Sequence, residues 1–464
     1  MINKIREQID NKKISVKEIA EEYIAKAQDS NPELNAYISI TEDYALSHLS
    51  NYPRNKLSGI PGIIKDNINI RGIRTTAGSR ILESYVSPYS ASVVSNLSDF
   101  TLIGKGNMDA FAFGSSTENS GYGVTHNPLD TKRVAGGSSG GVAAAVASGS
   151  ALFGIGTDTG GSVRQPASFC GVVGLKPTYG LCSRYGLIAM GSSFDTPGVI
   201  AGDVYDTAYV LNEIAKYDKK DSTSIKVIKQ DYTKFKDVKG LKVGVLNFSK
   251  DGVDPDIIDS FENSVKTIKS LGCEVKTIDL AHLKYSLAVY YILVPSEISA
   301  NLARYDGIRF GHHPEKTKDN NFESLNDFYI EARSKFEDEV KRRIMIGTYT
   351  LSSGYYDAYF NKALKVRNII KQEIKDAFLD VDVIISPTTP SVAFEIGKKI
   401  ENPLSMYLSD IFTVSSNIVG IPAISIPNGY YNKLPTGLQI MGRSFDESTI
   451  LSLANLIEQK LWKP

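Results

Sequence analysis

The sequence has few of the side chains that bind metals or form disulfide bonds. Only three of its 464 residues are cysteine: Cys170, Cys182 and Cys273. Three scattered cysteines are too few for a disulfide framework or a zinc site. We therefore predict three free thiols, which is typical of a protein in a reducing compartment, and no metal site.

Histidine, the most common catalytic base, is also scarce. The chain has five, at positions 48, 126, 282, 312 and 313. His312 and His313 lie in a polar segment and His126 lies in a turn sequence, so we predict surface or turn positions for them. A hydrolase with this sequence would need a different base.

Neither an excess of one charge nor a long apolar run is present. Lysine and arginine total 52, aspartate and glutamate also total 52, and the pI is about 7.0. This balance does not indicate a strongly basic nucleic-acid binder, although it allows a local basic patch. No apolar run approaches the roughly 20 residues of a membrane span. The first residues lack the apolar core of a signal peptide, so we expect a cytoplasmic protein without membrane contact.

Alternating helical and strand patterns indicate an α/β protein. Ser15 and Glu18 form a capping-box sequence that opens a helix, which we expect to end near residues 31–32. A strand is predicted over 34–40. Small residues over 140–149 predict a helix that packs closely at the centre of the fold, and a buried strand is predicted over 151–156.

The second half continues this alternation after a lysine-rich, polar segment over 217–240, which we interpret as a surface crossing. Helices are predicted over 254–271, over 355–379 and at the end of the chain. Strands are predicted over 241–248, 381–386, 423–427 and 436–441. The sequence has no internal repeat, so we expect one compact unit with a peripheral helical region.

Two glycine clusters contain serine. They are Gly136-Gly137-Ser138-Ser139-Gly140-Gly141 and Gly160-Gly161-Ser162. Such segments expose main-chain N–H groups that can bind an oxyanion beside a hydroxyl. A nucleotide site is the alternative, but the glycine spacing is not G-x-G-x-x-G and no Gly-Lys-Ser/Thr ending is present. The pattern favours a serine hydrolase.

Lys65 is the candidate base for these serines. It directly follows the apolar run 59–64 and precedes Asp66 and Asn67. Burial can lower the pKa of a lysine from about 10.4 toward neutrality, which lets it accept a proton. A lysine at the end of a strand is more often exposed, so this hypothesis depends on the serine clusters.

The order of these motifs resembles the amidase signature family. The resemblance runs from the first glycine cluster, through residues 154–167, to residues 170–178. Within that family the chain is most similar to the A subunits of the aspartyl/glutamyl-tRNA amidotransferases. The segments that carry this similarity are 107–109, 116–120, 183–187, 353–359 and 420–422, so it covers nearly the whole chain.

The resemblance implies the fold of that family. We expect a central mixed β-sheet covered by helices on both faces, in a single domain over 1–464. The catalytic core would span about 55–210. The peripheral helical region, about 285–380, would contribute to the substrate pocket.

The resemblance also implies a Ser-Ser-Lys triad. Ser162 would be the nucleophile, Ser138 the bridging hydroxyl after a cis peptide bond, and Lys65 the base. Ser139 is the competing assignment for the bridging serine. The oxyanion would be bound by main-chain N–H groups of the nucleophile loop, at Thr159, Gly160, Gly161 and Ser162.

Two charged residues fit a glutamine pocket by local matches to the same family. An arginine would bind the α-carboxylate of free glutamine, and a carboxylate would bind its α-ammonium group. The matches assign these roles to Arg343 and Asp410, with Arg342 as the alternative arginine.

The resemblance implies a glutaminase that works in a larger complex. The chain would hydrolyse glutamine and pass ammonia to partner subunits B and C of a heterotrimer. The complex would convert Glu-tRNA(Gln) or Asp-tRNA(Asn) to the amidated product, with ATP and Mg²⁺ bound at the partner and the misacylated tRNA held mainly there. This chain would bind no cofactor. The alternatives are a stand-alone amidase that acts on a small amide and a catalytically silent scaffold.

Overall fold

The computed structural model describes residues 1–49, 57–314, 322, 324–400 and 402–462. Its strands are β1 (Tyr37–Ile40), β2 (Pro61–Lys65), β3 (Thr101–Gly106), β4 (His126–Asn127), β5 (Asp130–Val134), β6 (Phe153–Asp158), β7 (Val173–Lys176), β8 (Thr196–Ala201), β9 (Lys242–Leu246), β10 (Glu274–Ile278), β11 (Val383–Pro387), β12 (Ala423–Tyr431) and β13 (Leu434–Gly442). Eleven of them form one sheet in the order β1-β3-β2-β6-β8-β7-β12-β13-β11-β9-β10, and β4 pairs with β5. The large sheet is mixed, because β2 runs parallel to β3 and β6 whereas β6 and β8 are antiparallel.

The α-helices are α1 (Ile2–Asp10), α2 (Val16–Leu34), α3 (Glu42–Ser47), α4 (Ser92–Leu97), α5 (Gly140–Ala147), α6 (Arg164–Cys170), α7 (Val204–Ile214), α8 (Pro255–Ser270), α9 (Ser286–Leu302), α10 (Leu325–Ser334), α11 (Asp338–Leu351), α12 (Lys362–Asp380), α13 (Pro403–Tyr407), α14 (Val414–Val419) and α15 (Glu447–Leu461). Short 3-10 turns are η1 (Arg80–Leu82), η2 (Ala110–Ala112), η3 (Leu283–Tyr285) and η5 (Leu408–Asp410), and η4 (Asp357–Asn361) is a π-helical turn.

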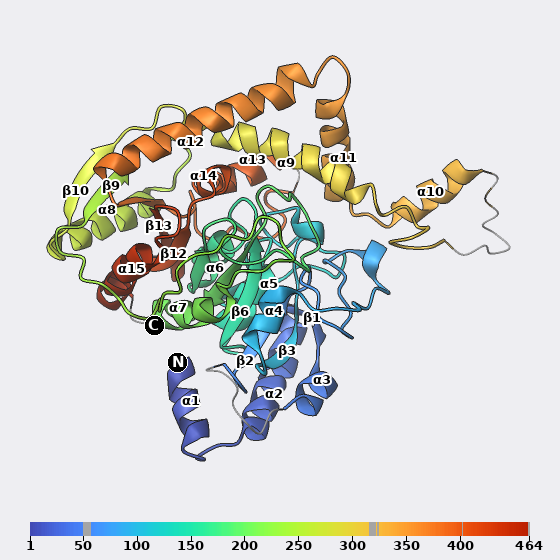
Figure 1. The fold of residues 1–464 in the computed structure, drawn as a ribbon, viewed down its shortest axis with the longest axis horizontal. Helices are drawn as coiled ribbons and strands as arrows, with labels where there is room; N and C mark the ends of the chain where they lie inside the picture. Colours follow the sequence, from blue (N-terminus) through green and yellow to red (C-terminus); the bar gives the residue numbers. More distant parts are fainter. Residues whose placement is uncertain (50–56, 315–321, 323, 401, 463–464) are drawn as a thin grey trace.

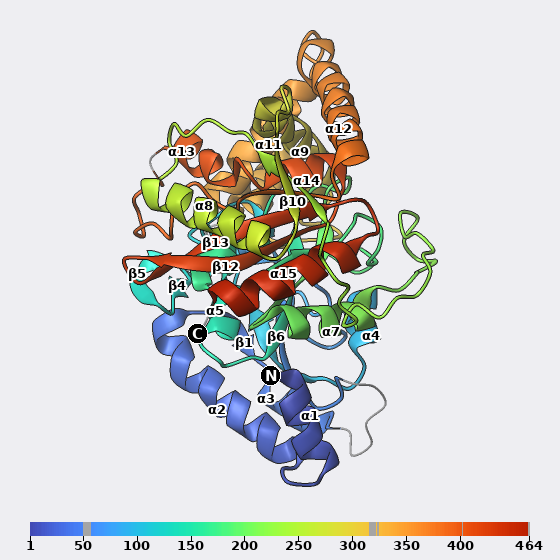
Figure 2. The same cartoon turned by 90° about the vertical axis from the view of Figure 1, so that its left-hand side faces the viewer.

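Helices cover both faces of the sheet, as predicted. Helix α15 contacts α7 and α8, and these three helices pack on one face, while α5 and α6 contact each other and pack on the other. A third group, α9, α11, α12 and α14, forms a helical layer along one side of the molecule, and α10 projects away from it (Figures 1 and 2). Two large apolar cores result, one along the sheet and one beneath this helical layer.

Helix α2 begins as the sequence predicts but ends later. The Ser15 hydroxyl accepts a hydrogen bond from the Glu18 amide, and the Glu18 carboxylate accepts one from the Ser15 amide. The predicted end near residue 32 is wrong, because the helix accommodates Pro32 and continues to Leu34. Asn35 then ends it with φ of 47°, a left-handed conformation that asparagine tolerates. The strand predicted over 34–40 therefore starts only at Tyr37.

Helix α5 lies at the centre of the fold, as its small residues predict. All its residues from Gly140 to Val146 are buried. A Cβ on Gly141 would lie 2.3 Å from the Ala36 carbonyl oxygen and 2.4 Å from the Asn107 amide nitrogen. Only glycine permits this approach, which brings the start of α5 against the edge of the sheet.

The predicted helix over 355–379 is partly wrong. Residues 357–361 form the π-helical turn η4, and the regular helix α12 begins only at Lys362. Tyr355, Tyr356 and Tyr359 stay at least about two-fifths exposed there, so this segment has no apolar face that would fix a regular helix start.

The three cysteines are free, as predicted, and all three are buried. His126, His312 and His313 are not buried, which agrees with the surface or turn positions predicted for them, and His48 and His282 are exposed. Across the described residues, no helix has both the length and the apolar composition needed to cross a bilayer.

Candidate active site

Three separate segments bring Lys65, Ser138 and Ser162 to one edge of the sheet. Lys65 is the last residue of β2, Ser162 lies in the loop after β6, and Ser138 lies directly before α5. Because β2 and β6 are parallel neighbours, their carboxyl ends lie side by side. The fold therefore places a buried lysine next to both glycine clusters.

Lys65 is fully buried, so the alternative of an exposed strand-end lysine is wrong. Its Nζ atom donates to Ser138 Oγ at 2.7 Å and to Thr157 Oγ1 at 3.0 Å. Burial lowers the pKa of Lys65 to about 7, although the nearby carboxylates of Asp109, Asp158 and Asp195 oppose this shift. A large fraction of Lys65 is therefore neutral near pH 7 and can accept a proton.

The structure distinguishes the two adjacent serines of the first cluster. Ser138 follows a cis peptide bond and its hydroxyl faces Lys65. The Ser139 hydroxyl points elsewhere and donates to the Thr157 carbonyl at 3.4 Å. A Cβ on Gly156 would lie only 2.7 Å from Ser139 Oγ, so Ser139 packs against the strand. Only Ser138 makes the lysine contact that a relay needs.

Ser162 lies close to this pair but is held only by its backbone. Its carbonyl accepts a hydrogen bond from the Ser139 amide at 3.1 Å, and its side chain is 8% exposed. Within the described residues, Ser162 Oγ has no hydrogen-bond partner. A proton relay therefore requires the Ser162–Ser138 contact to form when substrate binds.

The main-chain N–H groups of the nucleophile loop are not equivalent. The Gly161 amide donates to Asp158 Oδ1 at 3.0 Å. The amides of Thr159, Gly160 and Ser162 have no acceptor among the described residues. An oxyanion can use these three directly, whereas Gly161 would first have to release Asp158.

A buried ion pair fixes the nucleophile loop. Asp158 accepts bonds from the amides of Gly161 and Val163, on either side of Ser162. Its carboxylate also binds Arg164 through Nε and Nη2 at 3.0 and 2.9 Å, and both side chains are fully buried. Burial alone would raise the pKa of Asp158, but pairing with Arg164 lowers it to about 2. The sequence analysis did not identify this pair.

We expect Arg164→Leu to lower the free energy of unfolding by about 3–5 kcal/mol, because it leaves Asp158 as an unpaired buried charge. Chemical denaturation would measure this change. Lys26→Leu is the control, since it removes one partner of the half-exposed Lys26–Glu22 pair and should cost about 1 kcal/mol or less. Equal losses in the two variants would show that the buried pair does not stabilise the fold.

Arg343 of α11 lies in a buried aromatic cage next to the site. Its guanidinium group is 5.2 Å from the centre of the Tyr291 ring and 5.4 Å from that of Tyr407. Its Nε atom donates to Glu339 at 2.8 Å, and its terminal nitrogens have no hydrogen-bond partner among the described residues. Its neighbour Arg342 is 44% exposed and pairs with the other oxygen of Glu339. The geometry therefore favours Arg343 as the residue that binds a substrate carboxylate.

Asp410 is the second buried charge beside Tyr291. Its Oδ2 atom accepts bonds from Ser115 at 2.6 Å and Tyr291 at 3.3 Å, while Oδ1 has no donor among the described residues. Burial raises the pKa of Asp410 to about 7, although the bond from Ser115 and the charge of Arg343 oppose this shift. A bound ammonium group would favour the ionised form of Asp410.

Short contacts connect Asp410 and Ser115 with the nucleophile loop and with the first glycine cluster. Thr413 Oγ1 lies 2.7 Å from the Gly160 carbonyl and 3.1 Å from the Asp410 carbonyl. On the other side, Gln165 donates to the Ser115 carbonyl and accepts from the Gly137 amide. One set of contacts therefore links Asp410 and Ser115 with both serine-bearing glycine clusters.

Sequence reasoning missed several residues of this site: Ser115, Thr157, Asp158, Arg164, Tyr291, Glu339 and Thr413. Most are single polar residues in segments that otherwise predict core packing. Asp158 and Arg164 had one available signal, because they are opposite charges that flank the nucleophile in a segment of small and apolar residues.

Comparison with known proteins identifies the family of this chain. Residues 18–451 match the model of the Amidase family. The chain is 50% identical over 471 residues to a Thermoanaerobacter pseudethanolicus protein named as the A subunit of glutamyl-tRNA(Gln) amidotransferase, with 99% of this chain and 96% of that protein aligned. A protein of Heliobacterium modesticaldum with the same name is also 50% identical, over 97% of this chain and 94% of its own length.

Solved structures give the same result. The crystal structure of the A subunit of glutamyl-tRNA(Gln) amidotransferase from Thermotoga maritima is 41% identical, with a TM-score of 0.81 over 96% of this chain and 94% of that one. The 6-aminohexanoate cyclic dimer hydrolase shares the fold at 24% identity, with a TM-score of 0.85 over 100% of this chain and 97% of that one.

Proposed function

The chain belongs to the amidase family, and we propose that it is the glutamine-hydrolysing subunit of a tRNA-dependent amidotransferase. Similarity to glutamyl-tRNA(Gln) amidotransferase A subunits over nearly the whole chain supports this proposal. One structural observation carries it. A buried arginine and a buried carboxylate, Arg343 and Asp410, lie together against Tyr291, and contacts through Thr413 connect Asp410 with the Ser162 loop.

This pair of buried charges matches the two charged ends of a free amino acid. The terminal nitrogens of Arg343 can bind the α-carboxylate as a two-pronged donor. The free Oδ1 of Asp410 can accept from the α-ammonium group. With both ends held, the side-chain amide of glutamine would be directed at Ser162.

The first half of the reaction forms an acyl-enzyme. Neutral Lys65 takes the proton of Ser138, and Ser138 takes the proton of Ser162 as the Ser162 oxygen attacks the amide carbon. The negative charge that develops on the amide oxygen is stabilised by the free amides of the nucleophile loop. The proton then returns through Ser138 to the leaving nitrogen, which departs as ammonia.

The second half releases glutamate. Water gives a proton to the same relay and attacks the glutamyl ester of Ser162, and the serine regains its proton as the ester breaks. Each half-reaction leaves Lys65 neutral again. The overall change is glutamine plus water to glutamate plus ammonia.

We propose that partners use this ammonia. Subunits B and C would complete a heterotrimer in the cytoplasm, and B would bind the misacylated tRNA, ATP and Mg²⁺. The amidated product would be Gln-tRNA(Gln) from Glu-tRNA(Gln), or Asn-tRNA(Asn) from Asp-tRNA(Asn). We propose no cofactor for this chain.

A stand-alone amidase acting on a small amide is the second candidate, because the fold is shared with the 6-aminohexanoate cyclic dimer hydrolase. Such an enzyme has no need of a buried charge for each end of an amino acid. Burying both Arg343 and Asp410 costs solvation free energy. The charged ends of a glutamine substrate would offset this cost by binding the two side chains, whereas an uncharged amide would not.

The substrate pocket gives the test of this proposal. We expect Arg343→Ala and Asp410→Ala each to raise the KM for glutamine by about 10- to 150-fold, because each removes a charge-assisted contact worth roughly 1.5–3 kcal/mol. Hydrolysis of a small neutral amide should change far less, since Lys65 and both serines are untouched. Steady-state kinetics of both substrates on both variants would measure this difference.

Arg342→Ala is the matched control, because Arg342 shares the Glu339 contact but is half exposed. It should leave the KM for glutamine within a few-fold of the parent value. If the two pocket variants lost activity equally on glutamine and on the neutral amide, these residues would support the fold or the triad, and the case for glutamine would fail.

A further inference from the structure

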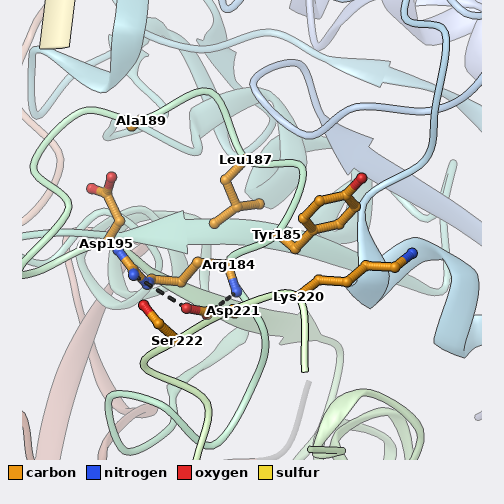
Figure 3. A pocket seen from close by; sticks show the side chains of 8 residues that line it. All are labelled: Arg184, Tyr185, Leu187, Ala189, Asp195, Lys220, Asp221 and Ser222. Carbon is orange, nitrogen blue, oxygen red and sulfur yellow. Dashed lines mark hydrogen bonds and ion pairs between the residues drawn. The ribbon is translucent and has the colours of Figure 1, made fainter. Parts of the chain in front are cut away.

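Three adjoining cavities form one groove on the surface. The first, of about 250 Å³, lies between the 184–189 segment and the 220–222 loop (Figure 3). The second, of about 570 Å³, shares Leu187 and Ala189 with the first. The third, of about 380 Å³, shares Ile81 and Ser84 with the second. Because neighbouring cavities share wall residues, they adjoin one another, and we refer to the three together as the groove.

Aromatic side chains line the middle cavity, and one of them, Phe310, is strongly exposed. They include Tyr85, Tyr89, Tyr305 and Phe310. Phe310 is 56% exposed, and the adjacent Ile308 is 58% exposed. Exposed aromatic side chains of this kind are enriched where proteins bind other proteins.

The groove carries an excess of positive charge. Its carboxylates are either paired, as Asp221 is with Arg184 and Glu83 is with Arg80, or deeply buried. Lys220 lies at one end, where its Nζ is 4.8 Å from the centre of the Tyr185 ring, and Lys335 lies at the other.

Two arginines add to this charge in the middle cavity. Arg304 donates to Asn301, a neutral residue. Arg309 is 77% exposed and forms a long ion pair with Asp306, at 4.0 Å. These four cations, at positions 220, 304, 309 and 335, complement a ligand with negative charges along its length.

The inner wall of the groove reaches the nucleophile loop. Asp195 lines the first cavity, and its Oδ1 atom accepts a bond from Thr159 Oγ1 at 2.7 Å. Thr159 lies three residues before Ser162. A molecule seated in the groove therefore lies near the point where ammonia is released.

We propose that this basic aromatic groove is the docking surface for an extended, acidic polypeptide segment of the partner subunit that receives ammonia. The inference rests on the proposed function and adds a specific surface to it. A polypeptide is favoured over a nucleic acid because the chain as a whole carries no net positive charge.

Charge reversal tests the docking. Lys220→Glu combined with Arg309→Glu should weaken binding of the purified chain to its co-expressed partner subunits at least about tenfold at low salt. It should also flatten the salt dependence of that affinity. Hydrolysis of a small neutral amide by the isolated chain should be unchanged, which shows that the variant is folded.

The matched control is Lys4→Glu combined with Lys229→Glu, which reverses two exposed lysines outside the groove. It should bind like the parent chain. If the groove variant also assembled like the parent at every salt concentration, the groove would not be a docking surface. The proposed function would survive that result, because the complex would still form and hydrolyse glutamine.

A photo-cross-linking residue in place of Phe310 identifies the occupant. In the co-expressed complex, we expect a cross-link to an acidic segment of a partner subunit, identified by mass spectrometry of the purified product. A cross-link to RNA would overturn the inference. So would the absence of any cross-link in a complex that still assembles.

Discussion

Ser162→Ala should abolish glutamine hydrolysis while leaving the protein folded. Loss of the nucleophile removes the acyl-enzyme pathway, so we expect the rate to fall by about four to six orders of magnitude. The Ser162 hydroxyl has no hydrogen-bond partner among the described residues, so its removal should change the free energy of unfolding by less than about 1 kcal/mol. Ammonia release from glutamine and chemical denaturation would measure the two quantities.

Replacing glutamine with an ammonium salt distinguishes loss of glutaminase activity from loss of complex assembly. The complex containing Ser162→Ala should still amidate its tRNA substrate when ammonium replaces glutamine, because the partner site is unchanged. Ser139→Ala is the matched control, since Ser139 faces the Thr157 carbonyl and not Lys65. A Ser162→Ala enzyme with near-parent glutaminase activity would refute the assignment of the nucleophile.

The parts of the fold that sequence could predict are those that local chemistry determines. The Ser15 capping box set the start of α2, and the run of small residues in α5 required a close approach that only the centre of the fold offers. Periodicity also placed β9 and α8 within about three residues of their observed bounds. The element ends were less predictable, because they depend on single residues such as Asn35.

The site was predictable where its residues stand in recognisable motifs. Lys65, Ser138 and Ser162 each adjoin an apolar run or a glycine cluster. The pocket residues are different, because α9, α11 and η5 come together only through tertiary packing. Tyr291 looks like an ordinary core residue of an apolar helix, and nothing local shows that its hydroxyl reaches Asp410.

The burial of Lys65 shows the same limit of prediction from sequence. A lysine that ends a strand is normally exposed, and the sequence offered only the preceding apolar run and the distant serine clusters as reasons to expect a buried one. The structure buries it because β2 lies between β3 and β6 and because α5 covers its carboxyl end. Burial comes from strand order, and strand order is a property of the whole sheet.

Lys65→Arg should be nearly as inactive as Lys65→Ala, because a guanidinium group keeps its proton at any accessible pH and cannot act as a base. We expect both variants to lose several orders of magnitude in glutaminase rate. Lys65→Met keeps the length of the side chain without the amine, and it should be equally inactive. Glutaminase assays of the three purified variants would measure this, and an active Lys65→Arg enzyme would show that only the charge of this residue is needed.

The pH profile tests the same role without removing the lysine. The rate should rise with pH through about 7, since only neutral Lys65 accepts a proton and burial lowers its pKa to that value. The Asp109 carboxylate opposes this shift, so Asp109→Asn should lower the pKa of Lys65 further and move the acidic limb of kcat/KM to lower pH. Asp380→Asn, at a carboxylate that is 72% exposed, should leave the limb in place. An acidic limb that stayed fixed in Asp109→Asn would assign the titration to another group, because Asp109 is the carboxylate that raises the pKa of Lys65 most.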